Sequence, residues 1–234
     1  CNKTIEIIMR IVAIIPVKEK SERVPSKNFK TFSDEKSLLD ILLEKLLKIE
    51  LLDHIYISTN KKDLDISHKK ISILERDEKY CNNITPWSDV ITHIANSIPE
   101  KDETSLVWCH TTSPLFDEYD KAVKLYKSFL NSNEYDGLIT VSELTKFIVS
   151  EKKQPINYSW GPWHTYSQNL EKLYSITYAL FIAKKIEMVR NRYVISKNPF
   201  FYKVSPYQSI DIDSNFDFKL AQLLLQNKEK FIDA

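Results

Sequence analysis

Short apolar runs alternate along the chain with stretches in which apolar residues recur every three or four positions. The first run, residues 11–15, is continuous and stops at Pro16, as expected of a strand buried on both faces. Other runs rich in apolar residues predict further strands at residues 55–58, 71–74, 106–109, 138–141 and 174–182. Together they predict a sheet whose strands are spaced widely enough for a helix between most of them.

The intervening segments have helical periodicity. Ser37 is a good N-cap for a helix whose core face would carry Leu39, Leu42 and Leu46. Further helices are expected at residues 89–98, 119–130 and 184–191, and a last one after Ser214. This alternation predicts a three-layer, doubly wound α/β fold with a mainly parallel sheet, in one domain from residue 9 to residue 234. Residues 1–8 precede Met9 and are expected to be an added segment, an alternative start or a native extension, without a complete signal peptide.

Residues 145–170 interrupt the alternation. They contain Trp160, Gly161, Pro162 and Trp163 among polar residues. Long irregular insertions of this kind often serve as a lid, a substrate wall or a dimer arm. We therefore expect a functional insertion at about this position.

The composition favours an ordinary α/β enzyme domain. The 234 residues carry a formal net charge of +1, so no global field points to nucleic acid or to an anionic membrane. No apolar run reaches the roughly 18 residues of a membrane-spanning helix. The three cysteines, Cys1, Cys81 and Cys109, cannot form a fully paired framework, which indicates a reducing, cytoplasmic location. The chain has only two glycines, which excludes the glycine-rich phosphate loops.

The most informative segment is residues 209–219, which read Ser-Ile-Asp-Ile-Asp-Ser-Asn-Phe-Asp-Phe-Lys. If residues 210–212 form a strand, Asp211 and Asp213 lie on one face of it. Two such carboxylates suit Mg²⁺, which fills its other positions with water and phosphate oxygens. The alternative is an acidic turn that leads into a helix.

A second informative segment follows the first strand. Its cations are Lys18, Lys20, Arg23 and Lys27, between Pro16 and Pro25 or just after them. Such a cluster can line a polyphosphate site, with loop amides as further donors. The alternative is a solvated, lysine-rich loop.

These two segments resemble, in their order, motifs of the acylneuraminate (CMP-sialate) cytidylyltransferases. The first loop matches at Ser21, Pro25, Lys27 and Asn28, with Lys18 where that family has arginine. The closing motif matches at residues 209–213 and 217–218, and residues 56–59, 112–115 and 140–143 resemble segments between the two. The resemblance covers roughly residues 10–232.

The resemblance implies a Rossmann-like nucleotidyltransferase that moves CMP from CTP to an acidic sugar and releases pyrophosphate, with Mg²⁺. It implies a homodimer formed by the insertion, and a place in surface polysaccharide biosynthesis. It assigns Lys18, Arg23 and Lys27 to the triphosphate as catalytic cations. The remaining implied roles are Ser21 and Asn28 on the triphosphate, Arg76 and Ser88 on the cytosine, Asp211 and Asp213 on the metal as catalytic residues, and His110, Thr112, Gln168 and Tyr178 on the acceptor.

Departures from the family pattern leave the acceptor open. Glu22 stands where the family often has a basic residue, Phe116 where it has arginine, and Tyr178 where it has glycine. The acceptor could be a sialate, a related nonulosonate, another acidic sugar or a phosphonate. Two other classes stay open from the sequence: a metal-dependent nucleotide-sugar glycosyltransferase with an Asp-x-Asp site, and a non-catalytic relative.

Overall fold

The computed structural model describes residues 9–130, 132 and 134–231. The expected N-terminal extension, residues 1–8, lies outside these described residues.

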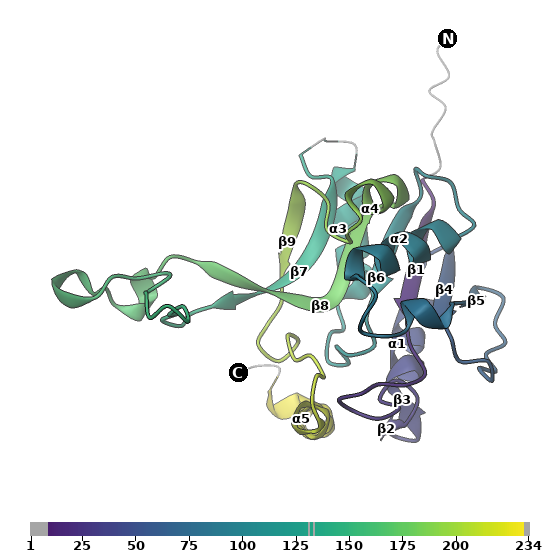
Figure 1. Ribbon diagram of the computed structural model, residues 1–234, viewed down its shortest axis with the longest axis horizontal. Helices are drawn as coiled ribbons and strands as arrows, with labels where there is room; N and C mark the ends of the chain where they lie inside the picture. The colour runs from purple at the N-terminus through teal and green to yellow at the C-terminus, as the bar shows by residue number, and fades with distance from the viewer. Residues whose placement is uncertain (1–8, 131, 133, 232–234) are drawn as a thin grey trace, which may run out of the picture.

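Seven strands of the described chain form one twisted sheet with the order β5-β4-β1-β6-β8-β7-β9 (Figure 1). Strands β5, β4, β1 and β6 are parallel, β8 runs antiparallel to both its neighbours, and β9 is parallel to β7. The mainly parallel sheet expected from the sequence is confirmed. The bounds are β1 (Ile11–Pro16), β4 (His54–Thr59), β5 (Ile71–Glu75), β6 (Ser105–Cys109), β7 (Gly137–Leu144), β8 (Leu173–Lys184) and β9 (Pro199–Lys203).

Two apolar layers separate the sheet from its helices. Helices α1 (Leu38–Leu47) and α3 (Tyr119–Phe129) pack on the odd-numbered side chains of β1, such as Ala13 and Ile15. Helices α2 (Trp87–Ser97) and α4 (Lys185–Asn191) pack on the opposite face, against Val12 and Ile14. Because successive side chains of a strand point to opposite faces, a continuous apolar strand requires this three-layer arrangement.

A third, smaller cluster joins the two ends of the chain. Val24 of the first loop and Phe32 of β2 (Thr31–Ser33) pack against Ile212 and against Phe218 of α5 (Asn215–Gln226). Phe32 and Phe218 meet edge to face, with ring centroids 5.1 Å apart. Strand β2 pairs with β3 (Lys36–Ser37) in a hairpin that the sequence pattern did not predict. The cluster places the first loop beside the closing acidic motif.

The structure corrects one element of the sequence prediction. Residues 210–212 are irregular chain between β9 and α5. They are anchored instead by Ile212, which is fully buried and whose N–H donates to the Thr112 carbonyl (2.9 Å). The segment between the turn at residues 206–209 and the N-cap Ser214 is too short to pair with the sheet. Strand β9, which lies at the sheet edge, was missed.

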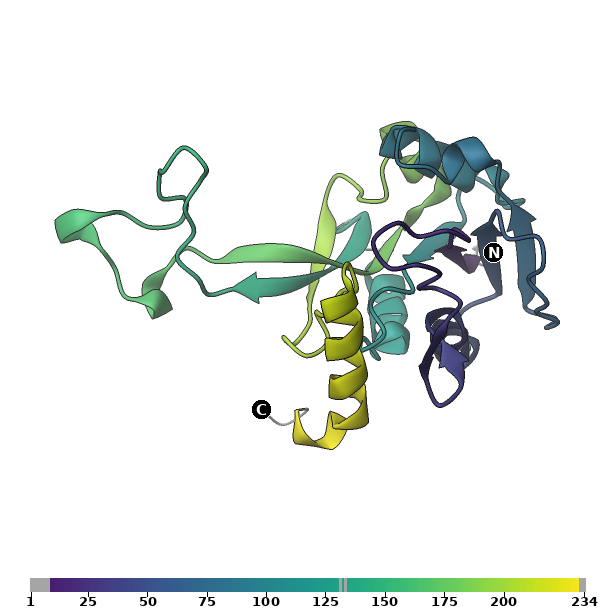
Figure 2. The same cartoon turned by 60° about the horizontal axis from the view of Figure 1, so that its bottom comes forward.

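The insertion projects from the body as a long ribbon formed by the ends of β7 and β8 (Figures 1 and 2). Residues 145–172 form its outer part, with 3-10 turns at Gly161–Trp163 and Ser167–Asn169. Phe147 stacks on His164 (centroids 4.9 Å apart), and buried Asn157 binds the backbone of Lys146 and Ile148. These contacts give the arm a small local core.

Within the part of the chain that the structure describes, we find no helix with the length and apolarity needed to span a bilayer.

Candidate active site

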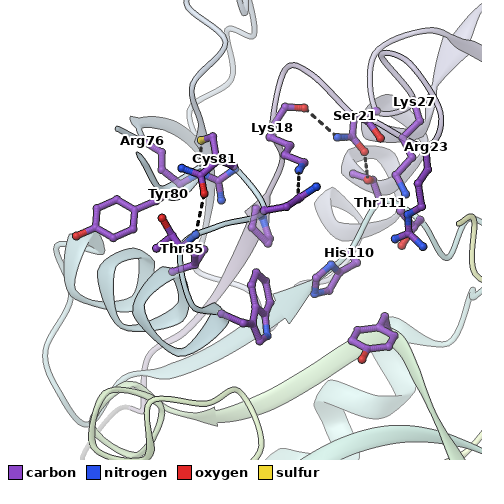
Figure 3. A pocket seen from close by; sticks show the side chains of 18 of the residues that line it. Lys18, Ser21, Arg23, Lys27, Arg76, Tyr80, Cys81, Thr85, His110 and Thr111 are labelled. Atoms are coloured by element: carbon purple, nitrogen blue, oxygen red, sulfur yellow. Dashed lines mark hydrogen bonds between the residues drawn. The ribbon is translucent and has the colours of Figure 1, made fainter. Parts of the chain in front are cut away.

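A cavity of about 660 Å³ opens where the first loop, the loop after β5 and the end of β6 converge (Figure 3). Parallel α/β sheets bind ligands at the carboxyl ends of their strands, and this cavity occupies that edge. The predicted residues that line it are Lys18, Ser21, Arg23, Lys27, Asn28, Arg76, His110, Thr112, Tyr178, Asp211 and Asp213. The structure therefore brings together residues that are almost 200 positions apart in the sequence.

The first loop places its cations along one wall of the cavity (Figure 3). The Lys27 ammonium donates to the Ile212 carbonyl (2.6 Å), and Arg23 pairs with Asp213 (2.7 Å). Lys18 reaches across to the Asn83 side chain (2.9 Å). All three are held by groups that a bound triphosphate could replace, so this wall can supply positive charge to phosphate oxygens.

The buried side chain of Asn28 fixes the backbone path of the first loop. Its amide donates to the Lys18 carbonyl (3.2 Å), and its side-chain oxygen accepts from Thr111 (2.7 Å). Ser26 takes the left-handed conformation, with φ +51°, that glycine would otherwise occupy. With both polar groups of its side chain engaged, buried Asn28 ties the loop to the end of β6.

Asp211 and Asp213 face the cations although they do not lie on a strand. Burial is the main cause that raises the pKa of Asp211, and the charge of Asp213 acts in the same direction. Thr112, Lys27 and Arg23 oppose that rise. For Lys27, burial lowers the pKa while the two carboxylates raise it. The two carboxylates and the Lys27 ammonium therefore each reduce the free-energy cost of burying the other's charge.

The acidic pair fits a magnesium ion by its chemistry. Asp211 Oδ1 is buried without a hydrogen-bond partner among the described residues. No group of three or more potential metal-ligating side chains occurs within the described ranges, so a metal here would rely on two carboxylates. That is the usual protein contribution to Mg²⁺ when phosphate and water supply the other ligands.

The opposite wall comes from the loop after β5, most of which the sequence analysis missed. Arg76 is buried and donates to the Val17 carbonyl (2.8 Å) and to Cys81 Sγ (3.1 Å). It therefore links this loop to the first one. Asn83, Thr85 and Trp87 also line the cavity. The signal available in the sequence was Pro86 directly before an amphipathic helix, which marks a loop ending at the edge of the sheet.

The cavity floor is aromatic. His110 lies just past the end of β6, and its ring is 5.8 Å from the ring of Tyr178 and 6.4 Å from that of Trp87. Thr112 lies two residues further on, beside Asp211. This floor carries little charge compared with the loop wall.

Two of the predicted residues lie elsewhere. Ser88 is in the first turn of α2 and does not line the cavity, although its neighbour Trp87 does. Gln168 is on the projecting arm and is exposed there. Their roles, like those of the residues that do line the cavity, stay predictions.

A family model described as cytidylyltransferase matches residues 12–159. The chain belongs to the cytidylyltransferase family. The family expected from the first loop and the closing motif is thus confirmed.

Curated relatives of this cytidylyltransferase family member include two N-acylneuraminate cytidylyltransferases. The protein of Escherichia coli O18:K1:H7 is 25% identical over 231 residues, which are 94% of this chain and 53% of that protein. The protein of Streptococcus agalactiae serotype III is 22% identical over 220 residues, 90% of this chain and 52% of that protein. The chain thus spans about half the length of the curated relatives it matches.

Solved structures share the fold at low identity. A CMP:2-keto-3-deoxy-manno-octonic acid synthetase complexed with CTP superposes with a TM-score of 0.64 at 10% identity, over 94% of this chain and 99% of that one. The 2-C-methyl-D-erythritol 4-phosphate cytidylyltransferase of Francisella tularensis gives 0.63 at 16%, over 92% and 99%. These matches support the Rossmann-like nucleotidyltransferase architecture expected from the sequence.

Proposed function

We propose that this protein transfers CMP from CTP to an acidic sugar, a sialate-like nonulosonate or a related acid, and releases pyrophosphate. The observation that carries the proposal is the cavity in a cytidylyltransferase family member where Lys18, Arg23 and Lys27 face Asp211 and Asp213. The acidic sugar is inferred from the relatives, whose names specify N-acylneuraminate.

In the proposed reaction, an acceptor hydroxyl oxygen forms a bond to the α-phosphorus of CTP. The bond from that phosphorus to the β-phosphate oxygen breaks, pyrophosphate leaves, and the hydroxyl proton passes to solvent. Charge builds on phosphate oxygens, so the enzyme contributes mainly by positioning and by cationic stabilisation.

The loop cations have defined tasks in this scheme. Lys27 is the most deeply set and lies beside the acidic pair, so it would contact the phosphates nearest the reaction. Arg23 and Lys18 are more exposed and would exchange Asp213 and Asn83 for phosphate oxygens. Asp211 and Asp213 would hold Mg²⁺, which supplies neutralisation of phosphate charge and a lower pKa for the acceptor hydroxyl.

A homodimer formed through the arm is part of the proposal. Trp163 and Tyr166 are 77% and 76% exposed at the outer part of the arm, and Val149, Ile156 and Trp160 are exposed nearby. Aromatic residues are enriched at protein interfaces, and so much exposed apolar surface favours a partner. A second copy could also bring Gln168 to an acceptor site. A cytoplasmic location and a role in surface polysaccharide biosynthesis stay predictions.

A screen for pyrophosphate release tests the proposed activity. The protein would be incubated with CTP, Mg²⁺ and a panel of acidic sugars, with phosphonates as a second acceptor class. We expect release with an acidic sugar, and much less when ATP, GTP or UTP replaces CTP. If pyrophosphate were released only with phosphonates, the acceptor would be a phosphonate and not an acidic sugar. CTP binding without release across the whole panel would contradict the enzymatic proposal.

A further inference from the structure

The cavity floor contains a hydrogen bond whose direction is fixed by chemistry. Trp108, fully buried on β6, donates its indole N–H to Nε2 of His110 (3.1 Å). An indole nitrogen can only donate, so Nε2 of His110 must accept and cannot carry a proton. The imidazole proton is therefore on Nδ1, and the ring is neutral.

The surroundings keep the ring neutral. Burial lowers the pKa of His110 to about 4, and the positive charge of Lys27 acts in the same direction. The other neighbours of the ring are Trp87 from α2, and Tyr178 and Phe181 from β8. With Nε2 occupied and Nδ1 protonated, His110 has no free lone pair to act as a base. It can offer one uncharged N–H.

Tyr178 reaches this floor because β8 bulges. Residues 177–180 of β8 face the single Thr140 of β7, between the pairs Ile139–Phe181 and Val141–Ile176. The Thr140 hydroxyl donates to the Thr177 carbonyl (3.0 Å) and accepts from Leu180 N–H (3.2 Å), which satisfies part of the bulged backbone. Bulges commonly re-aim a side chain next to a functional site. Here the Tyr178 ring lines the cavity and meets His110 edge to face.

The floor and the loop wall offer different chemistry to a ligand. The loop wall offers the cations of Lys18, Arg23 and Lys27, and the floor offers aromatic faces and one neutral donor. A carboxylate is best bound by cationic donors, whereas a sugar hydroxyl or carbonyl oxygen is well matched by a neutral N–H. The apolar face of a sugar ring suits an aromatic side chain.

The family resemblance already implies that His110 and Tyr178 contact the acceptor. We propose that they form an acceptor-selecting floor that binds only the uncharged part of the acceptor sugar, an oxygen on His110 Nδ1–H and a ring face on Tyr178. Trp108 is the positioning residue that fixes the His110 tautomer from outside the cavity. The proposal rests on the proposed function for the identity of the ligand as an acceptor. It places the recognition of the acceptor carboxylate elsewhere, on the cationic side.

The tautomer is measurable without turnover. Nitrogen-15 chemical shifts of His110 in the wild-type chain should show a protonated Nδ1 and an unprotonated Nε2 at pH 7. Trp108→Phe removes the indole donor and keeps an aromatic ring, and it should give a mixture of tautomers. Trp87→Phe is the matched control and should keep the wild-type tautomer. A protonated Nε2, or a charged imidazolium, in the folded wild type would overturn the assignment, even if Trp108→Phe itself fails to fold.

Binding of two probe molecules then tests which part of the acceptor the aromatic floor recognises. The probes are N-acylneuraminate and its uncharged methyl ester at the carboxylate, titrated by calorimetry in the presence of CTP and without added Mg²⁺. His110→Leu should weaken both probes by the same factor, about tenfold for a lost hydrogen bond. His110→Gln, which keeps a neutral donor and an acceptor for Trp108, should recover most of that loss. Equal binding of both probes to wild type and His110→Leu would overturn the proposal.

An effect of His110→Leu on only one of the two probes would also overturn the proposal. If His110→Leu weakened the acid and left the ester unaffected, His110 would bind the carboxylate. Tyr178→Ala should weaken both probes about fivefold by loss of the ring, whereas Tyr178→Phe should change neither. If neither probe bound to the wild type at millimolar concentration, the proposal would also fail. If the probes bound with this pattern but no pyrophosphate were released, the proposed function would be overturned. The proposal that His110 and Tyr178 bind the uncharged part of the sugar would still stand.

Discussion

The cationic loop wall and the aromatic floor of the cavity come from different kinds of structure. The cationic wall and the acidic pair lie on irregular chain, the first loop and residues 211–213, which the small cluster around Val24 and Ile212 holds together. The aromatic floor comes from the end of β6 and from the bulge within β8, next to Trp108 and Phe181, which are almost completely buried in the sheet layers.

The difference separates two tasks. Lys27, Arg23 and Lys18 are held in place by single contacts to a carbonyl, a carboxylate and an amide, and these can be exchanged when a ligand arrives. The His110 ring is held by a hydrogen bond from buried Trp108, and the backbone of Tyr178 is set by a bulge in β8. Charge is thus supplied by adaptable loops and shape by rigid strands, which favours a common nucleotide chemistry with a chain-specific acceptor.

The largest expected effect is at the acidic pair. Asp211→Asn keeps the side-chain shape and removes one charge, and we expect turnover to fall by at least about a hundredfold at saturating Mg²⁺ and CTP, because stabilisation of the transition-state charge is lost. Mn²⁺ binding, followed by electron paramagnetic resonance, should weaken in parallel. Asp63→Asn, at an exposed position away from the cavity, is the control.

The same variant should keep its fold. Burial raises the pKa of Asp211, so its charged form costs stability at neutral pH, and Asp211→Asn should melt no lower than wild type at pH 7. Near-normal turnover in both Asp211→Asn and Asp213→Asn would return residues 211–213 to an acidic turn before a helix.

The next effect concerns the loop wall. Lys27→Ala should weaken CTP binding by about 1.5–3 kcal/mol, the scale of a hydrogen bond to a charged group. Lys20→Ala is the matched control, because Lys20 is an exposed cation of the same loop that does not line the cavity. Calorimetry would measure both. Equal losses in the two variants would show that the loop acts only through its overall charge, and no loss in either would remove the loop from the nucleotide site.

The sequence predicted the sheet well because its strands are buried on both faces. Residues 11–15 and 106–109 are uninterrupted apolar runs, and such runs have few alternatives once two helical layers must cover them. The edge strand β9 was missed because Pro199 opens it and its side chains are only partly buried or exposed. The insertion was predicted at residues 145–170, close to the outer part of the arm at 145–172, but its ribbon form was not.

The charged residues of the site could be predicted, because a charged side chain indicates its chemistry without knowledge of its neighbours. Lys18, Lys27 and Asp211 could be proposed from charge and from the resemblance, and the structure brings them together. Residues 210–212 do not form the strand on which the expected placement of Asp211 and Asp213 depended, because the Ile212 N–H bonds to the Thr112 carbonyl, a contact that apolar alternation does not reveal. The Trp108–His110 bond and the bulge that places Tyr178 depend on contacts between strands, which no local pattern contains.

A smaller effect is expected at the arm. If the arm makes the homodimer, Trp163→Ala should weaken dimerisation by about 1–2 kcal/mol, as for an aromatic interface residue of average importance. Analytical ultracentrifugation over a dilution series would measure it. Ile73→Ala is a suitable control, because Ile73 is 38% exposed on β5, near the sheet edge opposite the arm, and does not line the cavity. A wild type that is monomeric at tens of micromolar would contradict the proposed homodimer, and the aromatic floor would then act without a second copy.

The smallest effect is at the cap that ends the acidic segment. Ser214 Oγ accepts from Asp217 N–H (3.2 Å), and Asp217 in turn accepts from the N–H groups of Ser214 (2.7 Å) and Asp213 (3.1 Å). Ser214 Oγ also donates to the Asp217 carboxylate (2.8 Å). Ser214→Ala removes both contacts of the hydroxyl and leaves the two backbone contacts, so Asp213 keeps its anchor. We expect a loss of about 1 kcal/mol in the free energy of unfolding. Turnover should stay within about threefold of wild type, because a cap acts on helix stability rather than on transition-state charge.

Ser37→Ala is the matched control for that cap. Ser37 and Asp40 form the same capping box at the start of α1, so urea denaturation should show a similar loss in both variants. Pyrophosphate release separates the two possibilities for α5. A turnover loss above about tenfold in Ser214→Ala alone, at equal stability, would mean that the cap positions Asp213. The acidic pair would then depend on a rigid helix end, as the aromatic floor depends on rigid strands.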